Sequence, residues 1–185
     1  ELRPSQKGEL VVRHKLPYSD ITSIDAAERQ RYIDADEPPY STDDILDYYT
    51  RLGFDAGVSV DHLIVKATMD QRDHRYALTL HNAEEFLREH RARGLPWTPI
   101  ASVQGWDPAT YAEAARQCVA MGHTHLALGG LARSSTAEVL AIAGAVHDVV
   151  PAGTQVHLFG VARVDALEAF ADLGVTSFDS ASYLR

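Results

Sequence analysis

Helical patterns of apolar residues alternate with short apolar runs along residues 41–185. The first predicted helix begins at Ser41, a good capping residue, and ends at Gly53. Its apolar side recurs at helical spacing, at Ile45, Tyr48, Tyr49 and Leu52. The pattern then predicts a β-rich segment over residues 57–64, and a long polar loop over residues 66–76.

The rest of the chain repeats this alternation. Helices are predicted over residues 82–93, from Asp107, from Ser135 and over residues 165–173, and strands over residues 100–103, 124–128, 156–159 and 176–178. Asp107-Pro108 and the capping box Ser135-Thr136-Ala137-Glu138 mark two of the helix starts.

Strands that alternate with helices are typical of βα units around a parallel sheet. The predicted fold is therefore α/β, of the (β/α)8 TIM-barrel type. Eight such units need about 250 residues, so the 185 residues given predict an incomplete or shortened barrel. A single domain is predicted over residues 1–185, although residues 1–40 show only a candidate strand at 10–12 and a polar, helix-like stretch at 25–31.

Charge and cysteine content narrow the function classes. Against 17 Lys and Arg stand 26 Asp and Glu, a net charge of -9, so nucleic-acid binding would have to rest on local patches. The chain has no apolar run long enough for a membrane helix and no signal-peptide pattern, which predicts a cytoplasmic protein. The single cysteine, Cys118, excludes a site of several thiolates and is expected to be buried.

Candidate functional residues come directly after the predicted strands, where the functional groups of βα folds gather. They are Asp61-His62, Gln104-Gly105, Gly129-Gly130-Leu131, Phe159-Gly160 and Asp179. A carboxylate and an amide can pair with the edge of a purine-like base, glycines admit backbone N–H groups, and an aromatic ring can stack on its face. The remaining carboxylate can act as nucleophile or general base.

Each of these features also has a purely structural interpretation. An Asp after a strand often caps a helix, and glycines after strands are common in turns. His123 and His125 share a strand face and could hold a metal, but no third ligand is near in sequence. Other polar residues are expected to be solvated, with the arginines also available to phosphates: His74, His81, His90, Arg72, Arg75, Arg88, Arg91 and Arg93.

Taken in order, these segments resemble the tRNA-guanine transglycosylase superfamily over roughly residues 40–185. The corresponding segments are Val58-Ser59-Val60-Asp61, Gln104-Gly105, Gly129-Gly130-Leu131-Ala132, Leu158-Phe159-Gly160-Val161 and Phe178-Asp179. Phe159 stands where the family has a Met. The resemblance implies that Asp61, Gln104 and Gly130 bind guanine, that Phe159 stacks on it, and that Asp179 is the catalytic nucleophile.

Pro38-Pro39-Tyr40-Ser41 and residues 178–185 are similar to the DpdA-type, DNA-modifying branch of this superfamily. That branch implies replacement of guanine in DNA by a 7-deazaguanine such as 7-cyano-7-deazaguanine, through a covalent Asp-glycosyl intermediate. Exchange on tRNA, in the queuosine and archaeosine pathways, and a catalytically silent base-binding subunit are the alternatives. A homodimer or partner modification proteins would be compatible with any of them.

The sequence departs from the family in two places. The family's other acid, in an Asp-Ser-Gly-Gly-Phe type segment, is expected near the join of Arg31 and Tyr32, where Asp25, Asp34 and Asp36 lack the following glycines. The family's zinc site would come after Arg185, so no metal or other cofactor is predicted within these residues, and zinc only if the protein extends further.

Overall fold

The computed structural model describes residues 2–4, 10–12, 41–161 and 163–179. The chain divides into two compact units, Glu1–Pro39 and Tyr40–Arg185. In the first unit, strand β1 (Leu2–Pro4) pairs antiparallel with strand β2 (Leu10–Val12), which confirms the strand predicted there. The helix-like stretch at residues 25–31 lies outside the described residues. The prediction of one domain over residues 1–185 stays a prediction.

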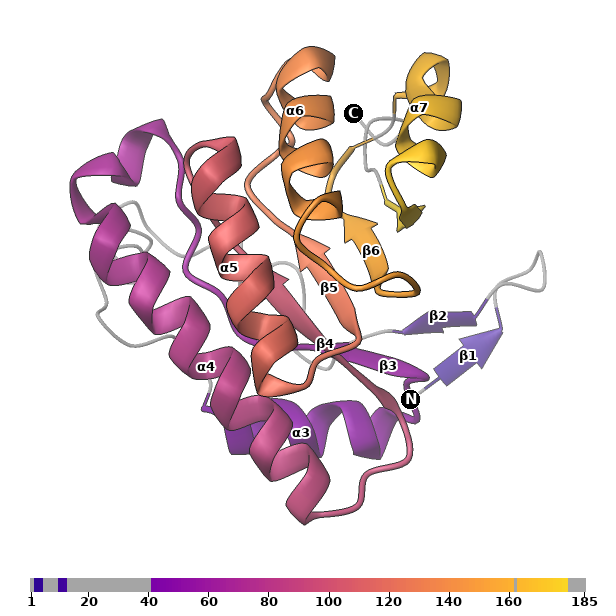
Figure 1. The fold of residues 1–185 in the computed structure, drawn as a ribbon. Helices are drawn as coiled ribbons and strands as arrows, with labels where there is room; N and C mark the ends of the chain where they lie inside the picture. The colour runs from indigo at the N-terminus through magenta and orange to yellow at the C-terminus, as the bar shows by residue number, and fades with distance from the viewer. Residues whose placement is uncertain (1, 5–9, 13–40, 162, 180–185) are drawn as a thin grey trace, which may run out of the picture. The chain divides into compact units, whose positions relative to one another are not determined.

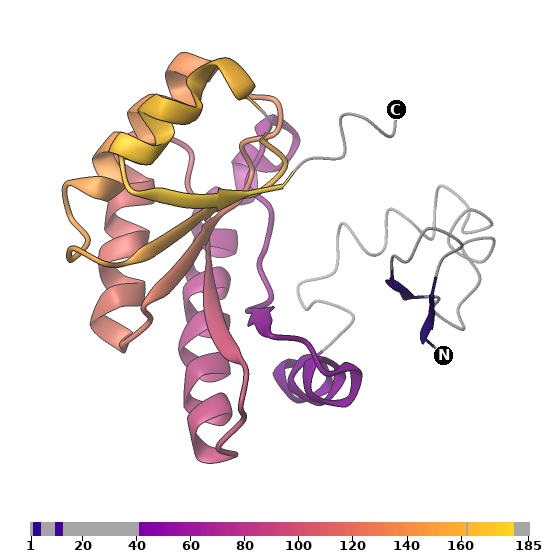
Figure 2. The ribbon, with the colours of Figure 1, turned by 90° about the vertical axis from the view of Figure 1, so that its right-hand side faces the viewer.

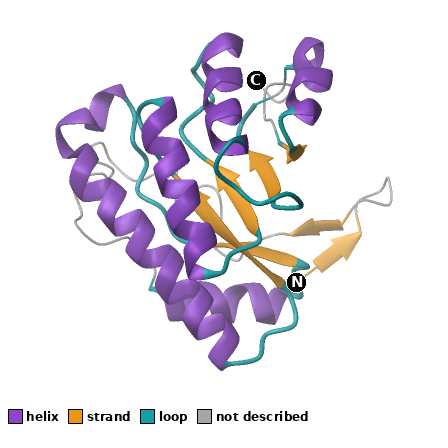
Figure 3. Cartoon of the chain, in the orientation of Figure 1, coloured by secondary structure: helices purple, strands orange, loops and turns teal. Residues whose placement is uncertain are grey.

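In the second unit, the described residues form a five-stranded parallel sheet whose strands follow one another in chain order (Figures 1 and 3). The strands are β3 (Ala56–Val58), β4 (Thr98–Val103), β5 (His125–Leu128), β6 (Gln155–Leu158) and β7 (Val175–Phe178). A helix lies in the connection between each pair of neighbouring strands. Sequential parallel strands with helical connections are the repeating unit of a (β/α) barrel, so the predicted α/β fold of this type is confirmed.

The helices are α3 (Thr42–Leu52), α4 (Arg72–Ala92), α5 (Pro108–Met121), α6 (Thr136–His147) and α7 (Leu167–Asp172), with short 3-10 helices η1 (Lys66–Gln71) and η2 (Val164–Ala166). Helices α4 to α7 cover one face of the sheet, as the side view in Figure 2 shows, and α3 packs against α4 and β3. The capping boxes at Ser41, Asp107 and Ser135 are present, as predicted for helix starts.

The two faces of the sheet differ in polarity. The face toward the helices is apolar and fully packed, with Ala101, Val103, Leu126, Leu128, Val156 and Leu158. Cys118 of α5 joins this core, and burial raises the pKa of its thiol to about 12, so the predicted structural role is confirmed. On the opposite face, strand pairing aligns four short or polar side chains, here called the inner row: Ser102, Ala127, His157 and Ser177.

Three expectations from the sequence were wrong. Residues 66–76 are not a loop, because they form η1 and the first turns of α4. The apolar side of α4 recurs every three or four residues from half-buried Tyr76 through Leu80, Ala83 and Leu87 to His90, a pattern that polar neighbours obscured. His90 is therefore buried rather than solvated, and its Nε2 lies 2.7 Å from the carbonyl oxygen of Trp97. The segment predicted as strand over residues 57–64 is strand only to Val58.

Candidate active site

The carboxyl ends of β4 to β7 each present one predicted site residue at the same level of the sheet. Strand pairing aligns the last residues of these strands, Val103, Leu128, Leu158 and Phe178. The ladder continues one residue further, because the N–H groups of Gly129, Phe159 and Asp179 donate to the preceding strand at 3.0, 3.0 and 3.3 Å. The structure thus brings four predicted residues into one line, here called the edge row: Gln104, Gly129, Phe159 and Asp179.

One end of the edge row is a buried amide joined to a carboxylate. Gln104 is 1% exposed. Its Nε2 donates to Asp61 Oδ2, and its Oε1 accepts from the backbone N–H of Ile64 at 3.4 Å. Asp61 lies in the loop after β3 and is exposed, so its carboxylate is presented at the surface while the amide behind it is fixed. A fixed amide and an accessible carboxylate are suited to binding the donor and acceptor edge of a base.

Glycine is required beside this pair. A Cβ on Gly129 would lie 2.2 Å from Gln104 Nε2, and a Cβ on Gly130 would lie 3.1 Å from Gln104 Oε1. Gly130 also has a φ of 77°, which side chains rarely adopt. Close packing against the Gln104 amide therefore requires glycine at both positions, beyond the general preference for glycine in turns.

The Tyr111 side chain supports the turn at Gly129 and Gly130. The sequence placed this residue only on the apolar face of its helix. Its hydroxyl donates to the carbonyl oxygen of Gly129 at 2.7 Å, and burial raises the pKa of this phenol above its ordinary value. A Cβ on Gly105 would lie 2.8 Å from the Tyr111 ring, so Gly105 acts by admitting this ring. No residue pattern announced this role, because a buried tyrosine on an apolar helix face is ordinary core.

Leu131 packs in the main core and is 1% exposed, so the structure places its side chain away from the edge row. Phe159 is half-buried in the edge row. Gly160 contributes through its backbone, whose N–H donates to Asp179 Oδ1 at 2.7 Å. Its φ of 68° and the 3.2 Å separation between a Cβ there and the Ala132 Cβ explain why glycine is suited to this position.

A β-bulge turns Asp179 toward the other site residues. Val156 pairs with Val175 but the next residue, His157, pairs with Ser177, so Thr176 is the extra residue in β7. Side chains of a regular strand alternate, and the bulge reverses the alternation after Val175, which packs on the helix side. Ser177 and Asp179 consequently join the inner row and the edge row.

His157 of the inner row also reaches this carboxylate, and sequence reasoning missed it. Its Nε2 lies 3.4 Å from Asp179 Oδ1, and its Nδ1 lies 2.9 Å from Ser177 Oγ. The sequence does contain a signal for this position. Side chains alternate along a strand, so the residue two positions before Phe159 lies on the same face as Phe159. A histidine one layer beneath a candidate nucleophile is therefore predictable from the alternation in β6.

The alternative of a metal site on His123 and His125 gains no support. His123 is buried before β5, with Nε2 3.0 Å from the carbonyl oxygen of Ala83, and burial lowers its pKa. His125 instead contacts Thr124 Oγ1 at 2.9 Å. Within residues 41–161 and 163–179, no three His, Cys, Asp or Glu side chains are grouped as metal ligands. The family's zinc site also does not fit here, since the one thiol, Cys118, is enclosed in the core.

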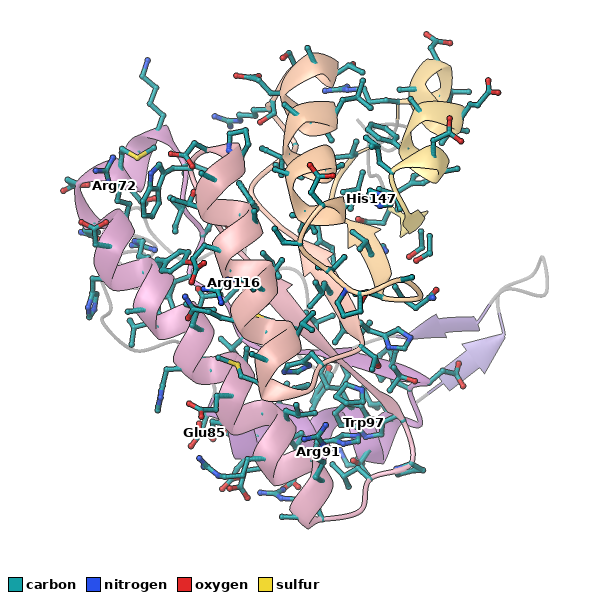
Figure 4. The ribbon with its side chains drawn as sticks, viewed as in Figure 1. Arg72, Glu85, Arg91, Trp97, Arg116 and His147 are labelled. Atoms are coloured by element: carbon teal, nitrogen blue, oxygen red, sulfur yellow. The ribbon has the colours of Figure 1, made fainter. Side chains whose placement is uncertain are left out.

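The arginines singled out from the sequence lie at both ends of α4, as Figure 4 shows for Arg72 and Arg91. At the far end from the site, Arg91 donates to the carbonyl oxygen of Gly122 at 2.9 Å and Arg93 pairs with Asp43 and Asp47. Arg72 lies over the ring of Trp106, 4.8 Å from its centroid, beside the loop after Gln104. Structural partners thus account for most of this charge.

Comparison with known proteins shows which family this chain belongs to. The family described as "Queuine tRNA-ribosyltransferase" matches residues 16–185. A protein of Salmonella montevideo named "DNA-guanine transglycosylase" is 30% identical over 164 residues, which cover 83% of this chain and 39% of that protein. The chain thus spans well under half the length of this relative. Every helix in the described part of the chain is too short or too polar to cross a membrane. The chain belongs to the queuine tRNA-ribosyltransferase family.

Proposed function

We propose that this chain carries the base-exchange site of a guanine transglycosylase, which replaces a guanine in a nucleic acid by another base. The observation that supports this most directly is the edge row. It has the Asp61–Gln104 pair at one end and a second carboxylate, Asp179, at the other. Base recognition and nucleophilic attack need these groups in one site with room for a nucleoside between them.

In this proposal the guanine lies along the edge row. The Asp61 carboxylate accepts hydrogen bonds from the N–H donors of the guanine edge, beside the Gln104 amide. The backbone N–H of Gly130 donates to the guanine carbonyl oxygen, and the Phe159 ring covers the face of the base. A base held in this way must leave a duplex stack, which costs a few kcal/mol unless the target is already unpaired.

The exchange proceeds by double displacement at the anomeric carbon of the target nucleoside. An oxygen of the Asp179 carboxylate attacks that carbon, the bond to guanine N9 breaks with its electron pair on nitrogen, and guanine leaves after taking up a proton. The incoming base loses the proton of its own ring nitrogen, attacks the same carbon and releases the Asp179 carboxylate. Two inversions leave the configuration of the sugar unchanged.

We propose DNA as the nucleic acid and 7-cyano-7-deazaguanine as the incoming base. The name of the Salmonella relative supports DNA, whereas the family description refers to tRNA. The discriminating experiment supplies full-length protein with isotopically labelled guanine and with DNA or tRNA in parallel. Labelled guanine is expected to enter DNA; incorporation into tRNA alone would replace DNA by tRNA as the substrate.

Replacing the proposed nucleophile tests the mechanism. Asp179→Asn is expected to lower exchange about 10³-fold or more, because an amide is a poor nucleophile at carbon. A covalent protein–DNA adduct should be trapped with the parent and not with the variant. Asp172→Asn is a matched control, since Asp172 is an exposed carboxylate at the end of α7. Unchanged adduct formation in Asp179→Asn would reject this residue as nucleophile.

The same assay separates the enzyme from a catalytically silent base-binding subunit. The first acid of the family pattern has no counterpart around Arg31 and Tyr32, and this favours the silent subunit as the second candidate. Binding of guanine without any exchange or adduct, in protein of full length, would establish that alternative.

A further inference from the structure

His157 occupies a position from which it can control the carboxylate at the end of the edge row. It lies in β6 on the inner face, while its neighbour Leu158 is 0% exposed on the helix face. Strand pairing puts it beside Ser177 of β7, and the bulge at Thr176 makes that pairing possible. Its side chain is 23% exposed, and its ring meets the Phe159 ring at 4.9 Å and 71°. His157 thus lies between the proposed stacking ring and the strand that carries Asp179.

The contacts with Ser177 and Asp179 together favour a proton on Nε2 of the ring. Nδ1 lies 2.9 Å from Ser177 Oγ, and Nε2 lies 3.4 Å from Asp179 Oδ1. If the serine hydroxyl donates to Nδ1, the neutral ring carries its proton on Nε2, facing the carboxylate. The other neutral tautomer would direct the Nε2 lone pair at a carboxylate oxygen, which is unfavourable. A protonated ring also places an N–H on Nε2, so Asp179 faces a donor in both charge states.

Both described contacts of the Asp179 side chain converge on one oxygen. Oδ1 accepts from the Gly160 N–H at 2.7 Å and faces His157 Nε2, whereas no described residue forms a hydrogen bond with Oδ2. The Asp179 side chain is 59% exposed, so packing alone does not fix its torsions. A second N–H that faces Oδ1 from another direction restricts the plane of the carboxylate more than the single N–H of Gly160 does.

We propose that His157, oriented by Ser177, is a positioning residue that turns Asp179 so that Oδ2 is presented to the anomeric carbon. This inference rests on the proposed function, because it takes Asp179 as the nucleophile. His157 itself does not touch the reacting atoms. His157 contacts both Phe159, the proposed stacking ring, and Asp179, the proposed nucleophile. The same side chain therefore supports the ring that covers the base and orients the carboxylate.

Two amide substitutions separate the contacts of the ring. In His157→Asn the amide lies where Nδ1 was, so the variant keeps a partner for Ser177 and loses the donor to Asp179. In His157→Gln the longer side chain can place its amide near the former Nε2 and restore that donor. In exchange assays on full-length protein, His157→Asn is expected to lower kcat about 10- to 100-fold with KM for DNA changed less than about threefold, and His157→Gln to recover most of kcat.

Two further variants complete the series. His125→Asn is the matched control, because His125 lies on the same inner face of the neighbouring strand without a contact to Asp179; its kcat should be unchanged. Ser177→Ala should lower kcat less than His157→Asn, because it loosens the ring and leaves Nε2 in place. Thermal unfolding of every variant identifies any loss that reflects misfolding, and His157→Gln carries the test if His157→Asn does not fold.

The outcomes distinguish this inference from the proposed function. If Asp179→Asn abolishes exchange while His157→Asn retains parental kcat, the nucleophile stands and the positioning role is overturned. An equal loss in the folded Asn and Gln variants also overturns it, since ring packing would then be the cause. If Asp179→Asn retains exchange, Asp179 is not the nucleophile, and the proposed function is rejected whatever the His157 variants show. A selective kcat loss in His157→Asn that His157→Gln reverses supports the inference.

Discussion

The two ends of the edge row are built differently. At the Asp61 end, Gln104 is 1% exposed and is enclosed by Gly129, Gly130 and the hydroxyl-bearing ring of Tyr111. At the other end, the Asp179 side chain is 59% exposed and depends on one backbone N–H and a nearby histidine. The first end is held by close packing, and the second by a few polar contacts at the last described strand.

This difference matches the tasks proposed for the two ends. Selecting one base requires donors and acceptors that cannot move to suit another base, because specificity comes from groups left unpaired by a wrong partner. A nucleophile that forms and breaks a covalent bond has to follow the anomeric carbon over a short path, so dense packing around it would be a hindrance. Substitutions at the packed end should therefore affect folding and base binding together, while those at the polar end should affect turnover alone.

Gly129→Ala tests the packed end and should have the largest effect among substitutions at that end. A Cβ placed 2.2 Å from Gln104 Nε2 must displace the buried amide or the turn. We expect the free energy of unfolding to fall by about 1–3 kcal/mol, as for other overpacked sites, and kcat/KM for exchange to fall about 100-fold. Urea unfolding and the labelled-guanine assay measure the two quantities.

Gly144→Ala is the control for that substitution. Gly144 lies inside α6, where the nearest atom to an added Cβ is a Leu173 methyl at 3.9 Å. Alanine has the higher helix propensity, so the variant should be as stable as the parent or more stable by up to about 1 kcal/mol. If Gly129→Ala behaved like Gly144→Ala, the close packing of the amide would not be what requires glycine.

Tyr111→Phe removes one hydroxyl from the same end and should have a smaller effect on exchange than Gly129→Ala. The carbonyl oxygen of Gly129 would lose a buried donor at 2.7 Å, which is expected to cost about 1–3 kcal/mol of stability and to raise KM more than it lowers kcat. Tyr76→Phe is the matched control, since the half-buried Tyr76 hydroxyl makes only a 3.5 Å contact with the carbonyl oxygen of Thr110. Equal destabilisation by the two substitutions would contradict a special role for Tyr111.

The sequence was sufficient to predict the fold type and the edge row, because both depend on periodicity and on the residues directly after each strand. Strand ends were correct to within one or two residues for β4 to β7, and Gln104, Gly129, Phe159 and Asp179 directly follow these strands, as predicted. The length of α4 was missed because polar residues dominate its first turns.

The supporting residues of the site could not be found in the same way. Tyr111 has the spacing of a core residue, and only its hydroxyl contact reveals that it supports the glycine turn. The orientation of Ser177 and Asp179 depends on the bulge at Thr176, a pairing irregularity between two strands that the residues of one strand alone do not signal. Contacts of this kind arise from the register between strands, so local patterns do not contain them.

A buried histidine outside the edge row extends the comparison to pH, with the smallest expected effect. His123 is 3% exposed, and burial holds its pKa below the ordinary 6.5. The hydrogen bond to Ala83 raises this pKa and the charges of Arg91 and His90 lower it, each with a smaller effect than burial. The unfolded chain therefore binds more protons than the folded one below about pH 6.5, so stability is full above this pH and falls as the pH is lowered. One proton contributes at most about 1.4 kcal/mol per pH unit. In His123→Gln, whose amide can still reach Ala83, the decline in stability between pH 6.5 and 5 should be shallower than in the parent. An unchanged decline in His123→Gln would mean that His123 does not contribute to acid sensitivity.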